Sequence, residues 1–229
     1  MNRFLLAIVI LAFPIAGYFL LQTGVNHFFS LPYYGPKNLS GTFHSRRGVK
    51  IPDTQYYSIP NYTLINQDSQ IFSQGSLDTN TIYIAGFFYT RTGFMGTNLI
   101  KGEDSLVRMF RIHPDVKFLS ISLDPEFDKP SLLKTYARKF HADTHQWYFL
   151  TGNKDSLFHL SRNFFFLNAM ERGKDSLLEH SPYLVLVDPK HHIRGYYDVT
   201  RDEELKKLRD EIIVLRLEVL RKETDIIQH

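Results

Sequence analysis

Two continuous apolar runs mark the centre of the predicted fold. Residues 81–88 (TIYIAGFF) and 116–123 (VKFLSISL) are rich in β-branched and aromatic side chains, which is typical of strands buried on both faces. Between them, residues 98–112 carry apolar positions near helical spacing until Pro114 ends the pattern. Strand, helix and strand with short links predict a parallel pair with a right-handed crossover.

Turn residues and amphipathic periods predict the remaining elements. They begin with a short strand hairpin (residues 59–64 and 70–72), a helix with Pro at its start (130–140) and a second helix (155–166). A late hairpin (183–187 and 193–199) and a charged final helix (200–222) follow. The order is β-hairpin, β, α, β, α, α, β, β, α, which predicts a mixed sheet with helices on both faces. We therefore expect an α/β, thioredoxin-like fold.

The final predicted helix carries a heptad-like seam. Leu205, Leu208, Ile212, Leu215 and Val219 recur at alternating spacings of three and four, and charged residues fill the positions between them. Two interpretations stay open. We expect the first half of the helix to dock on the sheet, whereas the part beyond about Leu215 is a candidate for self-association or for contact with a partner protein.

The amino-terminal segment differs in character from the rest of the chain. An apolar run without charge extends from Phe4 to Leu21, close to the roughly 20 residues that cross a bilayer as a helix. A cleaved signal peptide usually has a shorter apolar core and a small-residue cleavage site, and no such site is evident after Leu21. We therefore expect residues 1–22 to form a transmembrane signal anchor.

Residues 23–52 are rich in Gly, Pro, Ser and aromatic residues and show no clear period. We expect them to form an extended juxtamembrane spacer before a globular domain over residues 53–229. The aromatic side chains of Phe28, Phe29, Tyr33 and Tyr34 have two alternative places, either at the level of the lipid headgroups or on the surface of the domain.

Composition excludes two classes of function. The formal net charge is only +3 and the basic residues are scattered, so a nucleic-acid partner, which would need a basic stripe, is not expected. Cysteine is absent. The chain therefore has no disulfide, no thiolate nucleophile and no thiolate metal site, which excludes thiol–disulfide and peroxidase enzymes.

Five segments nevertheless match motifs of one known family, in the same order and at similar spacing. They are IPNYTLINQD at 59–68, FFYT at 87–90, SISLDPEFDKP at 120–130, WYFLTG at 147–152, and the stretch from EHS at 179 to IRGYYD at 198. Together they resemble the Sco/SenC family. Each motif alone is weak, but five in order are specific.

The resemblance implies a thioredoxin-like fold with one transmembrane helix, located at the bacterial inner membrane with the domain facing the periplasm. Members of the family bind copper and help to metallate cytochrome c oxidase, or act as thiol–disulfide reductants. They use a Cys-x-x-x-Cys pair after the FFxFT strand and a distant histidine. In this chain Thr92 and Gly96 occupy the two cysteine positions, and His180 occupies the histidine position.

These replacements argue against a copper cofactor. Copper(I) prefers thiolate or thioether donors, whereas a threonine hydroxyl is a hard ligand and glycine has no side chain. His180 is then either an inherited ligand position without a present role or a histidine bonded to backbone. A substitute site would need Met95 to meet His191 and His192. Otherwise Met95 fills a gap in the core and the two histidines lie in an exposed turn.

Three carboxylates lie close together at one strand-to-helix turn, Asp124, Glu126 and Asp128. They could serve acid–base chemistry, but we expect them to cap the helix that begins near Pro130. Pro182 precedes a predicted strand where thioredoxin folds place a cis-proline, and we expect the cis form.

The combined prediction is a membrane-anchored, Sco-like protein with a degenerate copper and redox site. It would act as a protein-binding or assembly-accessory module, with a respiratory complex as the expected protein partner. The alternative is a copper chaperone that uses methionine and histidine ligands.

Overall fold

The computed structural model describes most of the chain beyond its amino-terminal segment, namely residues 30–46, 49–91, 94–143, 145–167, 170–172, 177–179 and 182–227. The chain divides into two compact units, residues 1–30 and 31–229. The predicted anchor over residues 1–22 lies outside the described residues. Within the described ranges, no helix is long and apolar enough to cross a membrane.

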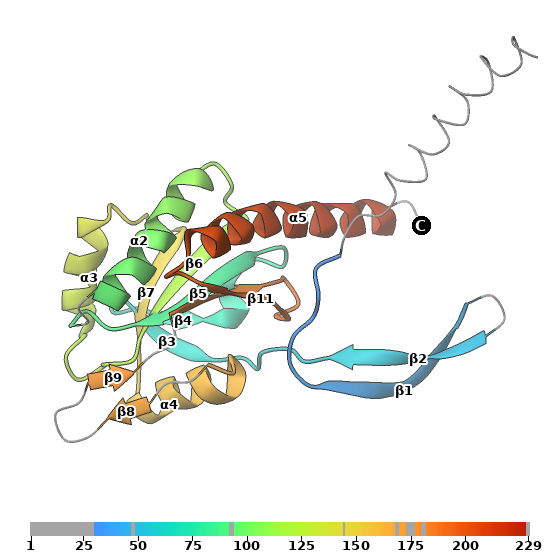
Figure 1. Cartoon of the computed structure of the whole chain (residues 1–229), viewed down its shortest axis with the longest axis horizontal. Helices are drawn as coiled ribbons and strands as arrows, with labels where there is room; N and C mark the ends of the chain where they lie inside the picture. Colours follow the sequence, from blue (N-terminus) through green and yellow to red (C-terminus); the bar gives the residue numbers. More distant parts are fainter. Residues whose placement is uncertain are drawn as a thin grey trace, which may run out of the picture. The chain divides into compact units, whose positions relative to one another are not determined.

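A mixed seven-stranded sheet lies at the centre of the second unit (Figure 1). Its strands, in spatial order, are β11 (Ile193–Asp198), β10 (Tyr183–Val187), β5 (Ile82–Phe88), β6 (Val116–Ser122), β7 (Trp147–Thr151), β3 (Thr63–Asn66) and β4 (Ile71–Ser73). The three central strands β5, β6 and β7 are parallel, and all other neighbours are antiparallel. The predicted mixed α/β sheet, with its parallel pair and late hairpin, is confirmed.

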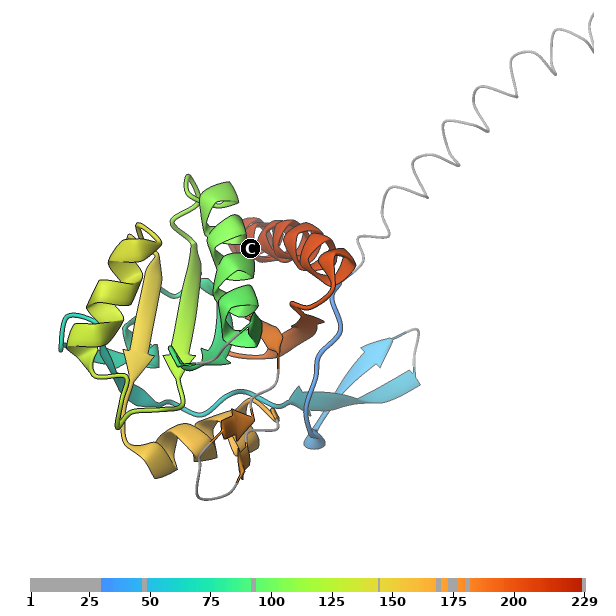
Figure 2. The same cartoon turned by 60° about the vertical axis from the view of Figure 1, so that its left-hand side comes forward.

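Helices cover both faces of this sheet, as Figure 2 shows. They are α2 (Phe94–Met109), α3 (Pro130–Lys139), α4 (Lys154–His159), which continues into a π-turn (Leu160–Phe164), and α5 (Asp202–Ile227). Core residues from α2, α3 and α5 form one cluster, and those from α4 form another on the opposite face. The sheet therefore has two separate apolar cores.

Strand β5 shows why the central apolar runs lack a period of two. Ile82 and Ile84 belong to one core cluster, while Tyr83 and Ala85 belong to the other. All four are fully buried. Because side chains alternate between the faces of a strand, burial on both faces requires an unbroken apolar run.

Several element boundaries differ from the prediction. Helix α2 begins at Phe94 rather than at residue 98, and the helix predicted over 155–166 changes to a π-turn after His159. The predicted order also omitted β7. Its five residues form a shorter apolar run than the seven of β5 and β6, and so short a run cannot be told from a buried helix segment by its pattern.

Two strands form where an extended spacer was expected. They are β1 (Lys37–Arg46) and β2 (Val49–Tyr56), which pair antiparallel with each other and with no other described strand. Another small pair, β8 (Met170–Arg172) and β9 (Leu177–Glu179), was also not predicted. Neither strand of the β1–β2 hairpin has a fully buried position among its described side chains, so the sequence lacks the alternation that marks a half-buried strand.

The seam of α5 is used within the domain. Leu208, Ile212 and Leu215 are fully buried, and Leu205 and Val219 pack partly buried against the same core cluster. The docked interpretation is confirmed for the first half of the helix. Because Val219 also packs on the domain, the seam predicted for a partner continues as an internal contact.

Candidate functional site

The loop after β5 and the first turn of α2 contain the two positions that the resemblance assigns to cysteines. Thr92 lies outside the described residues. Met95 and Gly96 belong to the first turn of α2, but only their backbone is described. The residues that lead into the loop, Tyr89 to Arg91, are described and show how its entrance is held.

Asp128 holds the start of the loop from the neighbouring strand-to-helix turn. Its carboxylate is fully buried and accepts hydrogen bonds from the Thr90 backbone N–H at 3.0 Å, from the Thr90 hydroxyl and from the Ser122 hydroxyl. These bonds join the ends of β5 and β6, which are parallel neighbours. A buried carboxylate with several donors is a rigid anchor, because each broken bond would leave a buried polar group unpaired.

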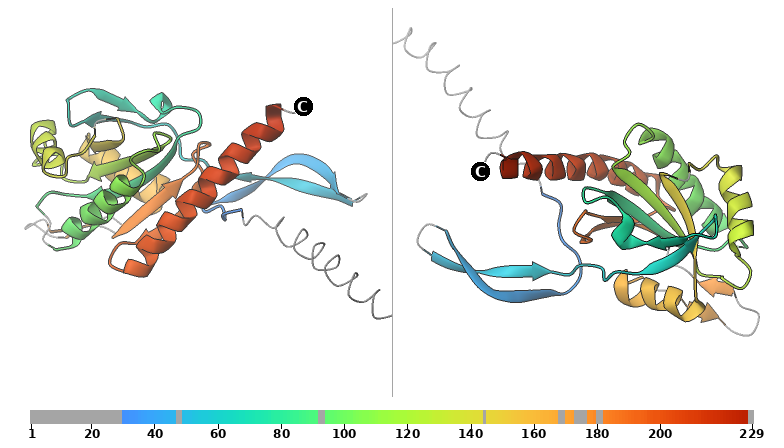
Figure 3. Two further views of the ribbon diagram at one scale, coloured as in Figure 1. Left: turned by 90° about the horizontal axis from the view of Figure 1, so that it is seen from above. Right: turned by 180° about the vertical axis from the view of Figure 1, so that it is seen from behind.

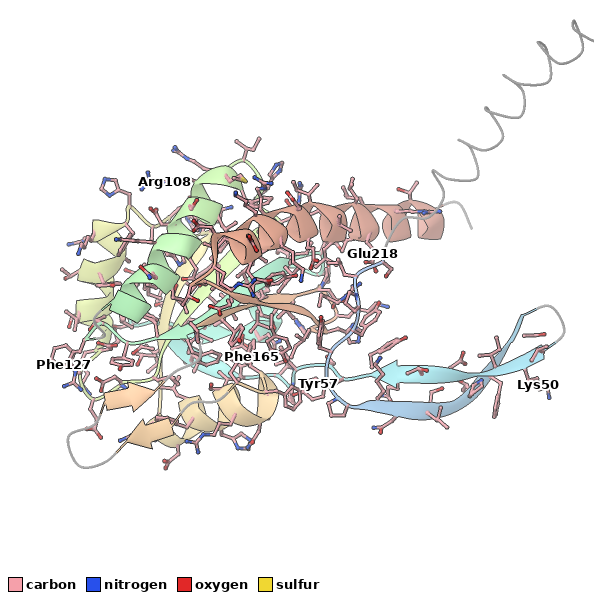
Figure 4. The ribbon with its side chains drawn as sticks, in the orientation of Figure 1. Lys50, Tyr57, Arg108, Phe127, Phe165 and Glu218 are labelled. Atoms are coloured by element: carbon pink, nitrogen blue, oxygen red, sulfur yellow. The ribbon has the colours of Figure 1, made fainter. Side chains whose placement is uncertain are left out.

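Arg91 and Asp124 make a second contact across the same edge. The guanidinium donates from Nε at 2.9 Å and from Nη2 at 2.5 Å to Asp124 Oδ2, and it lies 4.6 Å from the centre of the Phe127 ring, which Figure 4 labels. The hydrogen bond with Asp124 raises the pKa of Arg91. Arg91 is half exposed, so this pair orients the loop more than it stabilises the fold.

The capping role expected for the carboxylates is therefore wrong. Helix α3 has Lys129 at its N-cap and no side-chain cap bond. Asp124 and Asp128 instead accept hydrogen bonds from the loop after β5, and Glu126 is exposed. Sequence distance favoured the adjacent helix, but the parallel pairing of β5 with β6 brings the loop donors to the same place.

A buried carboxyl group lies under α2. Glu103 is fully buried and accepts a hydrogen bond from the Ser120 hydroxyl of β6, which in turn accepts from Trp147 Nε1 of β7 at 2.7 Å. Burial raises the pKa of Glu103 to about 8. The sequence carried a signal for this residue, since Glu103 falls between Leu99 and Leu106 on the apolar face of the helix.

Gly86 on β5 makes room for this group. A Cβ atom at this position would lie 2.8 Å from Leu184 Cδ2, 2.9 Å from Leu99 Cδ2 and 3.0 Å from Glu103 Oε1. Any larger residue would therefore have to displace these three side chains. The packing brings Glu103 beneath the helix whose first turn contains the former cysteine position.

Strand register contradicts the substitute copper site of Met95 with His191 and His192. Strand β10 is antiparallel to β5 and pairs Val187 with Tyr83, so the link after β10 lies at the amino end of β5. Met95, in the first turn of α2, follows the carboxyl end of β5. The five residue steps from Tyr83 to Phe88 span about 17 Å, so the backbone at Met95 and the backbone at His191 and His192 lie near opposite ends of β5.

The link after β10 instead belongs to a buried polar cluster around Arg194. The Arg194 side chain is 1% exposed and forms ion pairs with Asp188 at 3.0 Å and Glu218 at 2.8 Å. It also donates to the carbonyl of Leu31 at 2.6 Å and lies 4.2 Å from the centre of the Tyr33 ring. This cluster joins the start of the domain, strand β11 and helix α5.

Both histidines of this link are partly buried, so the exposed-turn expectation is wrong. His192 Nδ1 lies 3.2 Å from Asp188 Oδ2. Burial alone would raise the pKa of Asp188, but hydrogen bonds from His192 and the charge of Arg194 outweigh burial and hold this pKa below its usual value. Burial lowers the pKa of His191.

Tyr33 and Tyr34 cover the domain. The Tyr33 ring stacks on Tyr56 with centroids 4.0 Å apart, and the Tyr34 ring meets Tyr196 edge-on at 5.4 Å. Tyr34 also pairs with Ile193 of β11 through a backbone bridge. Of the two alternatives for these aromatic residues, the structure supports contact with the domain.

The remaining candidate residues are His180 and the other positions of the expected copper site. His180 and Ser181 lie outside the described residues, so the position of His180 and the isomer of the bond before Pro182 stay predictions. In the described ranges, no group of three or more His, Asp or Glu side chains converges as a metal site would. The side chains that would replace the two cysteines, Thr92 and Gly96, do not fit copper(I), because they offer a hydroxyl and no donor at all.

Residues 52–212 match the family model described as SCO1/SenC. A curated relative, the SCO1 protein homolog of Bacillus subtilis, is 29% identical over 147 residues, which cover 62% of this chain and 76% of the relative.

Solved structures share the fold. BsSco, described as carrying a disulfide switch and as a member of the Sco family of cytochrome c oxidase assembly proteins, is 22% identical with a TM-score of 0.61 over 70% of this chain and 94% of BsSco. Copper-bound ScoI of Arabidopsis thaliana is 20% identical with a TM-score of 0.59 over 71% of this chain and 99% of ScoI.

Proposed function

The chain belongs to the SCO1/SenC family, and from this membership we propose that it is an accessory protein of respiratory oxidase assembly that acts through protein contacts. It neither transfers copper nor exchanges thiols. Residues 1–22 anchor it in the bacterial inner membrane, and the domain faces the periplasm.

One observation carries the proposal: cysteine is completely absent from a chain that keeps the five sequence motifs of the family. Thiol–disulfide exchange requires a thiolate to attack a sulfur, and copper(I) capture requires soft donors. The loop entrance remains anchored through Asp128 and Arg91. A domain that keeps the fold around this loop but lacks the copper and thiol ligands is best suited to binding another protein, although a fold by itself does not specify a function.

The oxidase context comes from the relatives. BsSco is described as a member of a family of cytochrome c oxidase assembly proteins, and Arabidopsis ScoI binds copper. We propose that this chain contacts the same kind of respiratory complex, or its metallating proteins, at the loop edge formed by the ends of β5 and β6.

Copper titration tests the loss of chemistry. The full chain in detergent should show no stoichiometric, tight copper(I) binding. The variant with Thr92→Cys and Gly96→Cys should gain it, and adding His180→Ala should weaken it again. This series also tests the assignment of the three positions. Tight copper(I) binding by the unmodified chain that is lost on His180→Ala would contradict the proposal and favour the methionine–histidine alternative.

Oxidase assembly tests the function itself. A strain without this chain should hold less assembled oxidase in its membranes, and the unmodified chain should restore the amount. Added copper should not restore it, because the proposed role is a contact rather than metal supply. Recovery of assembled oxidase with copper alone, or an unchanged oxidase level in the deletion strain, would contradict the proposal.

A further inference from the structure

We propose that the β1–β2 hairpin is a second membrane contact, which binds the surface of an anionic bilayer. The inference rests on the proposed anchor over residues 1–22. The hairpin is a separate two-stranded sheet (Figure 3). The family match begins at residue 52, so all of β1 and the first residues of β2 lie outside it, and the family's activity does not account for them.

The hairpin exposes large apolar side chains that nothing in its own sheet covers. Leu39 is 72% exposed and Phe43 is 63% exposed, while Val49, on the other face of the ribbon, is 63% exposed. A soluble surface rarely gathers several such residues on one small element without an interaction partner. The side chains are apolar on a short exposed hairpin, which is the composition that enters the boundary between headgroups and acyl chains.

Register places Leu39 and Phe43 on one face. Their cross-strand partners are Thr54 and Pro52, which are two residues apart and therefore point to the same side of the ribbon. A register irregularity between Leu39 and Phe43 keeps both residues on this face.

Lysines flank the apolar pair on the same face. Lys37 pairs with Tyr56, and Lys50 pairs with Ser45. Along β2, Lys50 and Tyr56 lie at alternate positions with Pro52 and Thr54, so both lysines are on the same face as the apolar pair. Figure 4 labels Lys50 near the tip of the hairpin. An apolar centre between two lysines is the arrangement in which the ammonium groups meet lipid phosphates while the centre enters the interface.

Charge favours an anionic surface over a second copy of this chain. Residues 37–56 contain four Lys or Arg residues and one Asp, a net charge of +3 that equals the formal net charge of the whole chain. The single acid, Asp53, accepts a hydrogen bond from the Thr42 hydroxyl at 2.6 Å. Because it lies between Pro52 and Thr54 on β2, it is on the opposite face of the ribbon. Two such hairpins would repel each other, whereas anionic lipid attracts basic residues near its surface.

The length of chain permits the contact. Fifteen residues, 22–36, separate the apolar run ending at Leu21 from the start of β1. Fully extended, they span at most about 50 Å. A hairpin tethered this closely to a membrane anchor has a high effective concentration at the bilayer surface, so a weak interfacial contact is sufficient.

Single-cysteine labelling tests the inference, because the chain has no cysteine of its own. Phe43→Cys carries a polarity-sensitive fluorophore in the full chain, reconstituted in nanodiscs of zwitterionic lipid with or without phosphatidylglycerol. Ile71→Cys and Ile112→Cys, each at a position 81% exposed outside the hairpin, serve as matched controls.

The label at position 43 should show blue-shifted emission and quenching by lipid-phase quenchers in anionic nanodiscs, while both control labels stay in water. Combining Phe43→Cys with Lys37→Glu and Lys50→Glu should lower the ratio of immersed to exposed label roughly tenfold or more. A second label at Leu39→Cys should behave like the label at position 43.

The outcomes separate the two proposals. If carbonate extracts the chain from membranes, the anchor over residues 1–22 fails and the hairpin inference falls with it. If the chain resists extraction but the label at position 43 stays as exposed to water as the controls, only the hairpin inference is overturned. Shielding of that label without access to lipid-phase quenchers would indicate a protein partner or a second copy, and would also overturn it.

Discussion

At the scale of single residues, the loop edge depends on Asp128. Its buried carboxylate accepts three hydrogen bonds, two from Thr90 and one from Ser122. Asp128→Ala would leave buried donors unpaired, so we expect the free energy of unfolding in urea to fall by about 3 kcal/mol. The exposed Glu126→Ala, two residues away, is the matched control and should change it by less than about 0.5 kcal/mol. Equal effects from both variants would show that the hydrogen bonds of Asp128 are unimportant for stability.

Glu103 gives the domain a predicted pH dependence. Its pKa is about 8 in the folded chain against an ordinary value of 4.5, so between these values the folded state binds more protons than the unfolded state. The stability that this group contributes is complete below about pH 4.5 and is lost as the pH rises toward 8. The expected slope of the unfolding free energy is at most about 1.4 kcal/mol per pH unit.

Glu103→Gln is the control for this dependence. Glutamine keeps the size of the side chain and stays neutral, so the variant should lose this part of the decline of unfolding free energy between pH 5 and pH 8. Urea midpoints at successive pH values measure it. If the unmodified chain and the variant decline in parallel, the carboxyl group is not the titrating element.

At the scale of elements, α5 offers a test of its orientation. Leu215 is fully buried and Leu217 is 50% exposed, although the two lie two residues apart on the same helix. We expect Leu215→Ala to lower the unfolding free energy by about 2–5 kcal/mol through the lost contacts and the cavity. Leu217→Ala should change it by less than about 0.5 kcal/mol. Comparable losses would mean that both sides of the helix are covered, as by a partner.

Elements were predictable from the sequence where burial imposes a pattern. The unbroken apolar runs of β5 and β6 and the hairpin of β10 with β11 were recognised, because burial on two faces leaves few polar positions. The β1–β2 hairpin was not recognised, since it is held by pairing and local bonds such as Thr42 to Asp53 rather than by an apolar face.

At the scale of the whole molecule, Arg194 joins segments that are far apart in the sequence. It contacts Asp188, Glu218 and the carbonyl of Leu31 in a buried cluster. Arg194→Met would remove the buried cation that pairs with both Asp188 and Glu218, so we expect the unfolding free energy to fall by about 3–5 kcal/mol. Arg201→Ala, at a side chain that is 60% exposed, is the control and should have little effect. A small loss in Arg194→Met would show that the carboxylates find other partners.

The candidate site divides in the same way between what sequence can and cannot predict. Thr92, Gly96 and His180 were assigned because motifs along the chain resemble those of relatives. The bonds of Asp128 and the cluster of Arg194 with Glu218 depend on which strands become neighbours and on where α5 lies. No local pattern contains that information, and the same strand register separates Met95 from His191 by the length of β5.

The Arg194 cluster would have a mechanical consequence for the domain if residues 1–22 anchor it as proposed. Figure 4 labels Glu218 on α5, and the same guanidinium that pairs with Glu218 also holds the Leu31 carbonyl. Tension that travels along the chain from its amino-terminal side reaches Leu31 before it reaches β1. The load therefore passes through Arg194 and the Tyr34–Ile193 backbone bridge into α5 and strand β11 before it reaches β1, so the hairpin is shielded from the pull while the body of the domain resists it.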